Sequence, residues 1–512
     1  MASPIQSTSI AAPGFLGLNT QDSSVTLRDG FATVANNCVI DKFGRIGARQ
    51  GWTAQHTSNT DLSTSYLKTI AELIDTSGTS YIVAAGNNNL FYYDGTDLNT
   101  LSYGGGGTAP TITDDHWQTA SLNGIIYFYQ EGHDPLYFSP AQSTTSYFRI
   151  SENPSYVGTV QASNCVISAY GRTWSANTTT DKNTVQFSDL LEGYRLTYGT
   201  AGTLDVTTVW PAGGDEIVAL AAHNGRLHIF GRRQILIYDG AEEPATLQLV
   251  DAITGVGCVA RDSVVVTGGD VLFLSDSGVR SLQRVIQEKS APMRDISSNV
   301  RDDLVYEITL ENPQDIKAVY SDKHAFYLLS LPTRQLVYCF DMRSTLDNGA
   351  NRVTTWDNLV PRAFCYTRNK DLLFGNAGFI GLYDGYTDNT NTYRMKYYTN
   401  YFDFQSPTTM KFLKKVGITL FGGGGYTINL KFGFDYYDIL RNRQFSIGSA
   451  TVAEYNIAEY GIAEYGGSSF NSKTVNVGGS GRVIQLGIET IVDSKPISIQ
   501  KLDIYVKAGK TL

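Results

Sequence analysis

Three aspartates at equivalent places in a repeated Tyr-Asp-Gly triplet are the first candidates for chemistry. They are Asp94, Asp239 and Asp384. Carboxylates that recur on loops are typical of calcium sites and of acid–base catalysis. However, each aspartate stands where a polar turn would begin, and a side chain that caps its own turn explains the pattern without a ligand. We therefore expect turn capping at all three positions.

Two pairs of adjacent carboxylates point to a second kind of chemistry, glycan hydrolysis. They are Asp114 with Asp115 and Glu242 with Glu243. Glycosidases use two carboxyl groups placed roughly 5–10 Å apart around the scissile bond. The sequence alone does not fix the distance between groups on different turns. A carbohydrate-binding or glycan-processing protein is therefore one functional hypothesis that the sequence leaves open.

Motifs for metal, phosphate and nucleophile chemistry are absent from the sequence. The six histidines form no H-E-x-x-H motif, and there is no G-x-S-x-G. His223 and His228 are the only close pair, but a separation of five residues along one strand would place them on opposite faces. The glycine runs 104–107 and 422–425 lack the Lys-Ser/Thr of a phosphate-binding loop. We predict that the protein is not an enzyme and has no catalytic residue, no cofactor and no metal site.

The Tyr-Asp-Gly triplets belong to a larger repeat. Segments 79–97, 224–242 and 370–388 share two apolar strands around a polar turn, and their triplets begin 145 residues apart. An interval of 145 residues corresponds to three units of about 48 residues, a length typical of propeller blades. Weaker copies in the gaps bring the number of units to seven: 124–141, 165–190, 263–280 and 324–343.

Composition favours the same fold class. Charged residues make up 17% of the chain and aromatic residues 12%, with 50 glycines and 32 tyrosines, a mixture that suits short strands and tight turns. Units of this length are small antiparallel sheets that cannot bury both faces alone and must pack on one another. We therefore expect an all-β protein with a β-propeller of about seven blades. The alternative is a two-sheet sandwich in which the triplets recur by chance.

The spacing of the repeat ends after Asp388, and longer alternating strands follow, which indicates a second domain. The segment 13–52 is loop-rich and too polar to form a core of its own. Closing a propeller leaves both chain ends on the same side. The sequence therefore predicts three parts: an N-terminal segment 1–60 that packs with the C-terminal domain, a β-propeller 61–390, and a β-sandwich-like platform domain 391–512 formed with the chain ends.

Net charge argues against a global attraction to nucleic acid. The chain carries −9 in total, but residues 391–512 contain 14 Lys/Arg and 9 Asp/Glu, so this part carries +5 and the remainder −14.

No apolar run approaches the ~18 residues of a membrane span, so we expect no stable membrane insertion. The N-terminus lacks the basic region of a signal peptide. The five cysteines are widely spaced and odd in number, which predicts buried thiols instead of disulfides or a zinc site.

Two segments resemble a known protein family. The first holds Gly14, Gly17, Leu18, Asn19, Ala35, Asn37, Gly44, Arg49, Gly51 and Trp52, and the second is 223–282 with "RLHIFGRRQILIYDG" and "GVGCVARDSVVVTGGDVLFLSDSGVRSL". These residues look like those of tail nozzle or hub proteins of short-tailed bacteriophages, also called packaged-DNA stabilisation proteins and similar to the tail tubular protein B group. The resemblance in overall architecture covers most of the chain. Specific residues match only in these two segments.

The resemblance implies a structural virion protein, assembled in the host cytoplasm. Its copies would form a homohexameric ring that extends the portal–adaptor channel, retains and ejects DNA, and supports tail fibres or spikes. A needle or plug protein is a further implied partner. DNA would pass through the lumen without sequence-specific binding, and an acidic lumen would suit that role because each phosphate neutralised by Lys or Arg adds affinity that slows sliding.

The segment 452–467, "VAEYNIAEYGIAEYGG", repeats Ala-Glu-Tyr at a step of five residues, which fits neither a plain helix nor a plain strand. Bends at the intervening asparagine and glycines would return Tyr455, Tyr460 and Tyr465 to one face. Tyrosine is common at protein interfaces. We predict a subunit contact through these three tyrosines; a solvent-exposed irregular hairpin and a helix are the alternatives.

Lys411, Lys414 and Lys415 concentrate positive charge at the start of a strand in the platform domain. They form either a docking surface for an acidic adaptor ring or a solvated strand end. Reversing the charge of the three lysines distinguishes the two hypotheses, because unchanged attachment would exclude docking.

Overall fold

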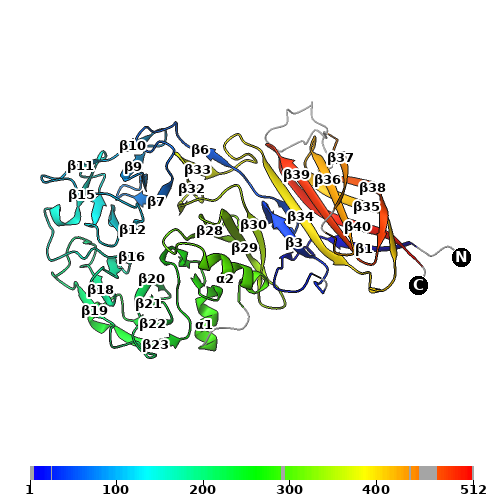
Figure 1. Cartoon of the computed structure of the whole chain (residues 1–512). Helices are drawn as coiled ribbons and strands as arrows, with labels where there is room; N and C mark the ends of the chain where they lie inside the picture. Colours follow the sequence, from blue (N-terminus) through cyan, green and yellow to red (C-terminus); the bar gives the residue numbers. More distant parts are fainter. Residues whose placement is uncertain (1–4, 25, 290–294, 438–439, 449–469, 510–512) are drawn as a thin grey trace.

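The computed structural model describes residues 5–24, 26–289, 295–437, 440–448 and 470–509. Seven small sheets are arranged in a ring, and a two-sheet body lies beside it (Figure 1).

Blades one to four contain β7–β10 (Leu67–Ile74, Ser80–Gly86, Asn89–Tyr93, Leu98–Thr100), β11–β15 (Ser102–Tyr103, Gln118–Leu122, Ile125–Tyr129, Leu136–Phe138, Ser146–Arg149), β16–β19 (Cys165–Ala169, Arg172–Ala176, Thr184–Phe187, Gly202–Asp205) and β20–β23 (Ile217–His223, Arg226–Gly231, Gln234–Asp239, Gln248–Thr254). Blades five to seven contain β24–β26 (Val265–Val266, Val271–Ser275, Gly278–Ser281), β27–β30 (Lys317–Ser321, Phe326–Leu331, Leu336–Thr345, Asn351–Trp356) and β31–β33 (Phe364–Tyr366, Leu372–Asn376, Phe379–Tyr383).

The first strands of the blades close the ring. β7 contacts β12, β12 contacts β16, and the series continues through β20, β24, β27 and β31 until β31 contacts β7 again. Each of the seven repeat units found in the sequence falls in a different sheet. The chain therefore folds as a seven-bladed β-propeller, and the predicted all-β class and blade number are confirmed.

A strand from the N-terminal segment completes the last blade. β6 (Trp52–Ala54) pairs with β33, and the turn before it lies against residues 385–389. The prediction that all of 1–60 packs with the platform is therefore wrong for β6. The physical reason is that β33 would otherwise be the outer strand of a three-stranded blade with unpaired backbone groups, and β6 pairs with them.

The platform is a sandwich of two sheets built from both ends of the chain. One sheet contains β1 (Ile5–Ala11), β4 (Cys38–Ile40), β5 (Ile46–Ala48), β35 (Lys411–Gly422), β38 (Phe470–Gly481) and β40 (Ile497–Ala508). The other contains β2 (Gly17–Leu18), β3 (Phe31–Asn36), β34 (Tyr393–Phe402), β36 (Thr427–Phe434), β37 (Arg441–Ser446) and β39 (Ile484–Val492). Alternating apolar side chains such as Val416, Ile488 and Ile504 share one core between the sheets.

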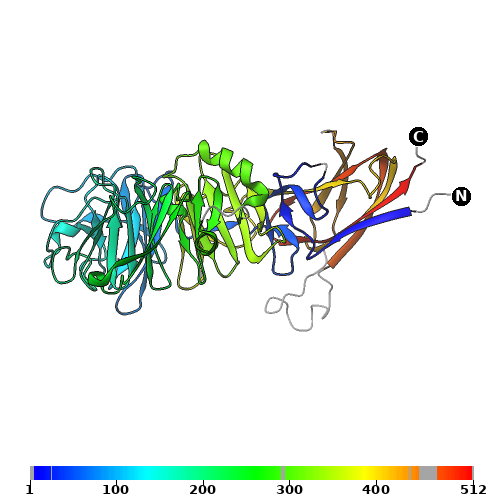
Figure 2. The same cartoon turned by 90° about the horizontal axis from the view of Figure 1, so that it is seen from below.

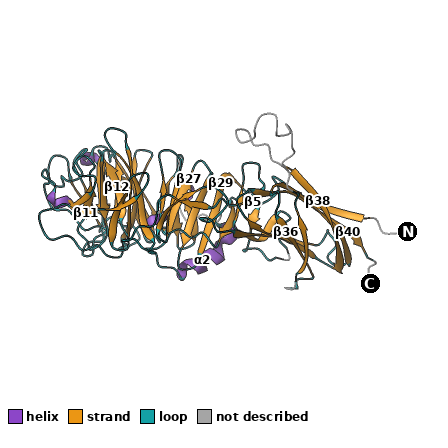
Figure 3. Cartoon of the chain, turned by 90° about the horizontal axis from the view of Figure 1, so that it is seen from above, coloured by secondary structure: helices purple, strands orange, loops and turns teal. Residues whose placement is uncertain are grey.

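The platform and the propeller share one continuous sheet. β3 pairs with β34 of the platform and, through Asn36 opposite Thr355, with β30 of blade six. The resulting ten-stranded sheet runs from β27 to β37. Viewed from below and from above, the molecule is elongated, with the propeller at one end and the platform at the other (Figures 2 and 3). Strands β1 and β40 pair at the end of the platform remote from the propeller.

Two short helices, which the sequence analysis did not predict, accompany blade five. α1 (Leu282–Glu288) follows β26 directly, and the Ser281 side chain caps it by accepting a hydrogen bond from the Arg284 N–H. α2 (Arg301–Thr309) contacts β26. The part of the chain that the structure describes also contains four 3₁₀ turns: Ile150–Glu152, Pro244–Thr246, Arg261–Ser263 and Ser298–Val300. Among the described residues, no helix is long and apolar enough to cross a membrane. All five cysteines are free and buried, as predicted.

Candidate functional site at the propeller axis

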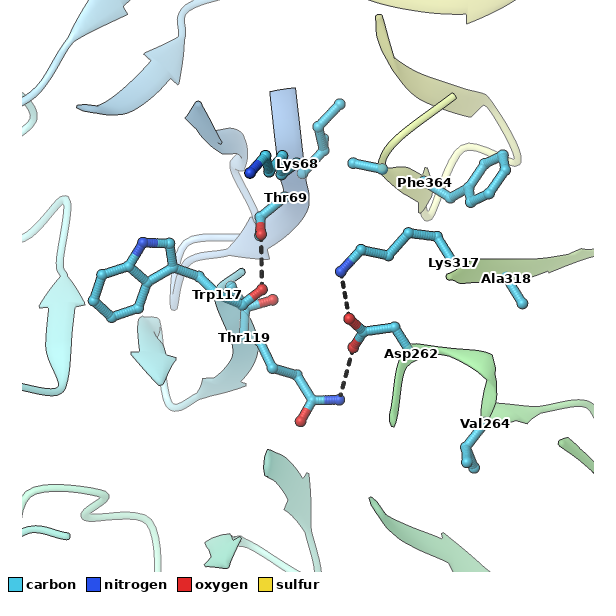
Figure 4. Close-up of a pocket in the computed structure, with 12 residues that line it drawn as sticks. Lys68, Thr69, Trp117, Thr119, Asp262, Val264, Lys317, Ala318 and Phe364 are labelled. Carbon is cyan, nitrogen blue, oxygen red and sulfur yellow. Dashed lines mark hydrogen bonds and ion pairs between the residues drawn. The ribbon is translucent and has the colours of Figure 1, made fainter. Parts of the chain in front are cut away.

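The inner strands bring charged residues from distant parts of the chain together at the propeller axis. Lys68, Gln118 and Lys317 stand at the start of β7, β12 and β27, and Asp262 lies in the 3₁₀ turn before β24. All four line one cavity of about 180 Å³, here called the axial cavity. Figure 4 shows Lys317 and Asp262 facing each other across it. The propeller therefore creates a polar site that no local sequence motif encodes.

Asp262 is the centre of a group of four residues that we call the axial cluster: Arg261, Asp262, Lys317 and Gln118. The Arg261 guanidinium donates to both carboxylate oxygens, from Nε to Oδ1 at 2.9 Å and from Nη2 to Oδ2 at 2.8 Å. Lys317 Nζ donates to Oδ2 (Figure 4), and Gln118 Nε2 donates to Oδ1 at 3.4 Å. The carboxylate thus accepts four hydrogen bonds, which fills the acceptor positions of its two oxygens.

Arg261 extends the axial cluster to blade three and adds a second contact with blade two. Its Nη1 donates to the backbone oxygen of Asn164 at 2.5 Å and to the Asn164 side chain at 3.0 Å, and its Nη2 donates to the His116 carbonyl at 3.0 Å. Through these bonds the axial cluster joins blades two, three, five and six. It therefore holds the inner ends of blades that are far apart in sequence.

The charges of the axial cluster are fixed by their mutual contacts. Burial alone would raise the pKa of Asp262, but the adjacent Arg261 and Lys317 outweigh it and hold that pKa well below its usual range. Burial lowers the pKa of Lys317, and the attraction of Asp262 opposes this only in part. Because Asp262 stays ionised and fully hydrogen-bonded, it is unsuited to be a general acid or base near neutral pH.

Asp262 also lines a second cavity of about 180 Å³. Its wall contains further ion pairs, with Lys182 2.5 Å from Glu131 and Arg232 paired with Glu216. His116 also lines it, 3.8 Å from Asp315. Burial, assisted by Lys68 and Lys317, lowers the pKa of His116 to about 4 against the opposing attraction of Asp315. The second cavity is thus lined by groups that already neutralise one another.

The aspartates of the three Tyr-Asp-Gly triplets all accept hydrogen bonds from backbone N–H groups nearby, and at Asp94 this is the predicted turn cap. Asp94 Oδ1 accepts hydrogen bonds from the N–H groups of Thr96 and Asp97. Asp239 and Asp384 each accept one from the N–H of the following glycine. These glycines have positive φ, which residues with a Cβ rarely adopt. Among the described residues, no group of three or more His, Cys, Asp or Glu side chains is placed to hold a metal ion.

The structure does not bring the two carboxylate pairs together. Asp114 and Asp115 lie beside the axial cavity, where the Asp114 carbonyl accepts a hydrogen bond from Lys68 at 2.8 Å. Asp115 is buried, and this burial raises its pKa. Glu242 and Glu243 are exposed on the turn between β22 and β23, in blade four. A two-carboxylate glycosidase centre formed from these pairs is therefore not supported.

The prediction for the two neighbouring histidines needs correction. His223 ends β20 and His228 lies in β21, so they are on paired strands of a hairpin and not on one strand. The turn at residues 224–225, with positive φ at both, reverses the chain between them. His228 Nε2 lies 3.4 Å from the His223 carbonyl oxygen, and the His228 side chain is buried.

The three lysines proposed for adaptor docking have different environments. Lys411 is buried, and its ammonium group donates to the carbonyls of Ser406, Thr409 and Arg482 at 2.6, 3.1 and 2.6 Å. A docking role for Lys411 is therefore wrong, because the alternation of β35 turns this side chain inward. Lys414 and Lys415 are exposed.

The tyrosines proposed as a subunit contact lie outside the described residues. These are Tyr455, Tyr460 and Tyr465 in the segment 449–469. The subunit-contact prediction for them stays a prediction.

Sequence reasoning missed the axial cluster. Asp262 and Lys317 are 55 residues apart, and neither belongs to a recognisable motif. One signal was present: both are charged residues next to short apolar strands whose other positions are suited to burial, "VVV" after Asp262 and "AVY" after Lys317. A charge in such a place needs a buried partner. Only the order of the blades in space identifies that partner.

Comparisons with known proteins give structural neighbours only. No family model and no curated protein matches the chain. YCF48 from Cyanidioschyzon merolae is 9% identical over 65% of this chain and 99% of its own, with a TM-score of 0.40. The WD40 domain of Neurospora crassa Pan2 is 10% identical over 65% and 96%, with a TM-score of 0.36. PorZ, a surface component of the type-IX secretion system of Porphyromonas gingivalis, is 12% identical over 64% of this chain but only 37% of its own, with a TM-score of 0.35. The propeller assignment rests on the sheets and their closed ring of contacts.

Proposed function

We propose that the protein is a structural component of a short-tailed bacteriophage tail, a nozzle or hub subunit. Its copies form a ring that extends the portal–adaptor channel for DNA retention and ejection and supports fibres or spikes. The resemblance of residues 13–52 and 223–282 to this family motivates the proposal. A virion location and an adaptor partner follow from the same resemblance.

The observation that carries the proposal is the state of the propeller axis. Axial pockets of propellers are common places for ligands and reacting groups. Here the axis is occupied by the axial cluster, in which the carboxylate of Asp262 is shared by Arg261 and Lys317. A carboxylate in this state neither accepts a proton nor contacts a substrate readily. The site suits the holding of blades together, which is the task of a wall-forming subunit.

The same observation restricts where DNA would pass. The cavities beside Asp262 measure about 180 Å³ each, far too small for a duplex. In the proposed ring the channel therefore lies between copies of the chain and not along the axis of any one propeller. The acidic balance of residues 1–390 suits a lumen that repels the DNA backbone, while the basic balance of residues 391–512 suits contact with an acidic adaptor.

The connection between the platform and the propeller supports a load-transmitting role. The ten-stranded sheet passes from blade six into the platform, and both ends of the chain are strands of that platform. A force on the propeller is therefore transmitted through backbone hydrogen bonds and not through a flexible linker. A subunit that must stay in place during DNA ejection benefits from this connection.

The test is the oligomeric state of the full chain, alone and with the adaptor protein, measured by sedimentation and by electron microscopy of negatively stained particles. We expect a hexameric ring with a central opening between subunits, formed alone or on addition of the adaptor. A glycan array with the same preparation tests the alternative function. A chain that stays monomeric with adaptor and portal present and retains a defined oligosaccharide would overturn the proposal.

A further inference from the structure

The ammonium groups that line the axial cavity have more N–H donors than they have hydrogen-bond acceptors among the described residues. An ammonium group has three N–H donors. Among the described residues, Lys317 has one hydrogen-bond partner, Asp262, and Lys68 has one, the Asp114 carbonyl. Both side chains line the axial cavity, and that of Lys317 is only 8% exposed. A buried cation with unused donors beside an open volume favours a ligand that accepts hydrogen bonds.

The acceptor side of the axial cavity is already saturated. Asp262 is the one carboxylate among the described residues that line it, and it accepts four hydrogen bonds, including two from Arg261. It therefore has no acceptor position left for a cation or for the hydroxyl groups of a sugar. The groups still available are donors: the ammonium groups of Lys68 and Lys317 and the hydroxyl of Thr119, which also lines the cavity.

The charge balance favours an anion as well. The anionic charge that acts on Lys317 comes from Asp262, which is shared with Arg261, and more weakly from Asp315. The net effect on Lys317 is a lowered pKa, which means that the surrounding anionic charge does not compensate for burial. A second negative charge, bound in the axial cavity, would add the attraction that Lys317 needs to compensate for its burial.

We propose that the axial cavity binds a small oxyanion, for which inorganic phosphate is the probe. Its oxygens accept hydrogen bonds from Lys68 and Lys317, and Thr119 adds a neutral donor. The volume of about 180 Å³ admits a tetrahedral anion together with water but not a polymer. This binding does not depend on the proposed ring function, and either one can fail without the other.

The experiment measures phosphate binding to the full chain at constant ionic strength, with chloride replacing phosphate in the reference. Isothermal calorimetry gives the affinity, and the unfolding temperature reports the same site by linkage. We expect saturable binding at one site per chain. Lys68→Met should weaken it at least tenfold and Thr119→Val should weaken it several-fold, because each removes a donor. Lys68 is chosen over Lys317 because Lys68 donates its hydrogen bond to a backbone carbonyl, that of Asp114, whereas Lys317 donates to the buried carboxylate of Asp262.

Lys473→Met, which removes an exposed lysine from β38 of the platform, is the matched control and should bind phosphate as the unmodified chain does. Absence of saturable binding by the unmodified chain would overturn the proposal. Equal affinity of the unmodified chain and Lys68→Met would overturn it too, because phosphate would then be bound elsewhere.

Discussion

Arg49 and Asp388 form a buried ion pair with two parallel hydrogen bonds, between the N-terminal segment and the turn that follows the last blade. Nη1 lies 2.8 Å from Oδ1 and Nη2 2.7 Å from Oδ2. The Arg49 side chain is fully buried, and its guanidinium lies 4.1 Å from the centre of the Tyr393 ring at the start of β34. One side chain therefore ties together the N-terminal segment, the end of the propeller and the platform.

Removing one partner of this pair should destabilise the protein strongly. Asp388→Asn or Arg49→Met leaves a buried charge or its hydrogen-bonding groups uncompensated, which typically costs about 3–5 kcal/mol. The free energy of unfolding from denaturant titration measures the effect. The exposed pair Arg28 and Asp347 provides the control, and Asp347→Asn should leave stability unchanged. Equal effects of Asp388→Asn and Asp347→Asn would contradict the assigned role of the buried pair.

Pairing of β6 with the last blade should depend on the absence of a side chain at Gly51. A Cβ at this position would lie 1.9 Å from the Thr387 carbonyl oxygen, so the backbone leading into β6 would have to move. Gly51→Ala should therefore lower the free energy of unfolding by about 1–3 kcal/mol or more. Limited proteolysis should also cut the chain near β6 more readily. Gly106→Ala, at an exposed glycine with open space around it, should change neither quantity.

The three platform lysines should separate into one structural residue and two surface residues. Lys411→Met removes the donor for three backbone carbonyls and should cost about 1–3 kcal/mol of stability. Lys414→Glu with Lys415→Glu should leave the unfolding temperature nearly unchanged, because both side chains are exposed. The double variant then tests adaptor docking in a binding assay. Normal attachment of that variant would remove these lysines from the docking surface.

Stability should fall on acidification, and His228 should account for part of the loss. Burial lowers the pKa of His228 to about 4 from its ordinary value of 6.5, so the folded state keeps it neutral while the unfolded state binds a proton. The contribution is complete above pH 6.5 and is lost as the pH falls toward 4. Between about pH 7 and about pH 4.5 the loss amounts to roughly 2–3 kcal/mol.

His228→Leu removes this group, so its free energy of unfolding should fall less over the same pH interval. His116 and His324, whose pKa values are also lowered to about 4, are present in both proteins and cancel in the comparison. Denaturant titrations at several pH values give the slope of the free energy of unfolding against pH for the unmodified chain and for His228→Leu. Identical slopes would show that His228 does not titrate as its burial implies.

The local sequence predicted those features that depend on neighbouring residues. The regular interval between the three Tyr-Asp-Gly triplets, together with the weaker copies between them, predicted the number of blades. Asp94 caps its turn through N–H groups only two and three residues away. The helix α1 escaped prediction because its seven residues are too few to show a helical period within a strand-rich repeat. The assignment of Lys411 to the surface failed because the face of a strand on which a side chain lies is set by the packing of the sheet.

The sequence by itself determined an all-β chain with seven repeated units and a longer-stranded C-terminal domain, since strand alternation and turn chemistry act over a few residues. Only the tertiary structure decided that β6 completes the last blade, that Arg49 meets Asp388, and that Lys317 meets Asp262 at the axis. These contacts join residues 55 to 339 positions apart. Their partners are chosen by ring closure and by the need of each buried charge for an opposite one, and neither condition is written in any short stretch of the chain.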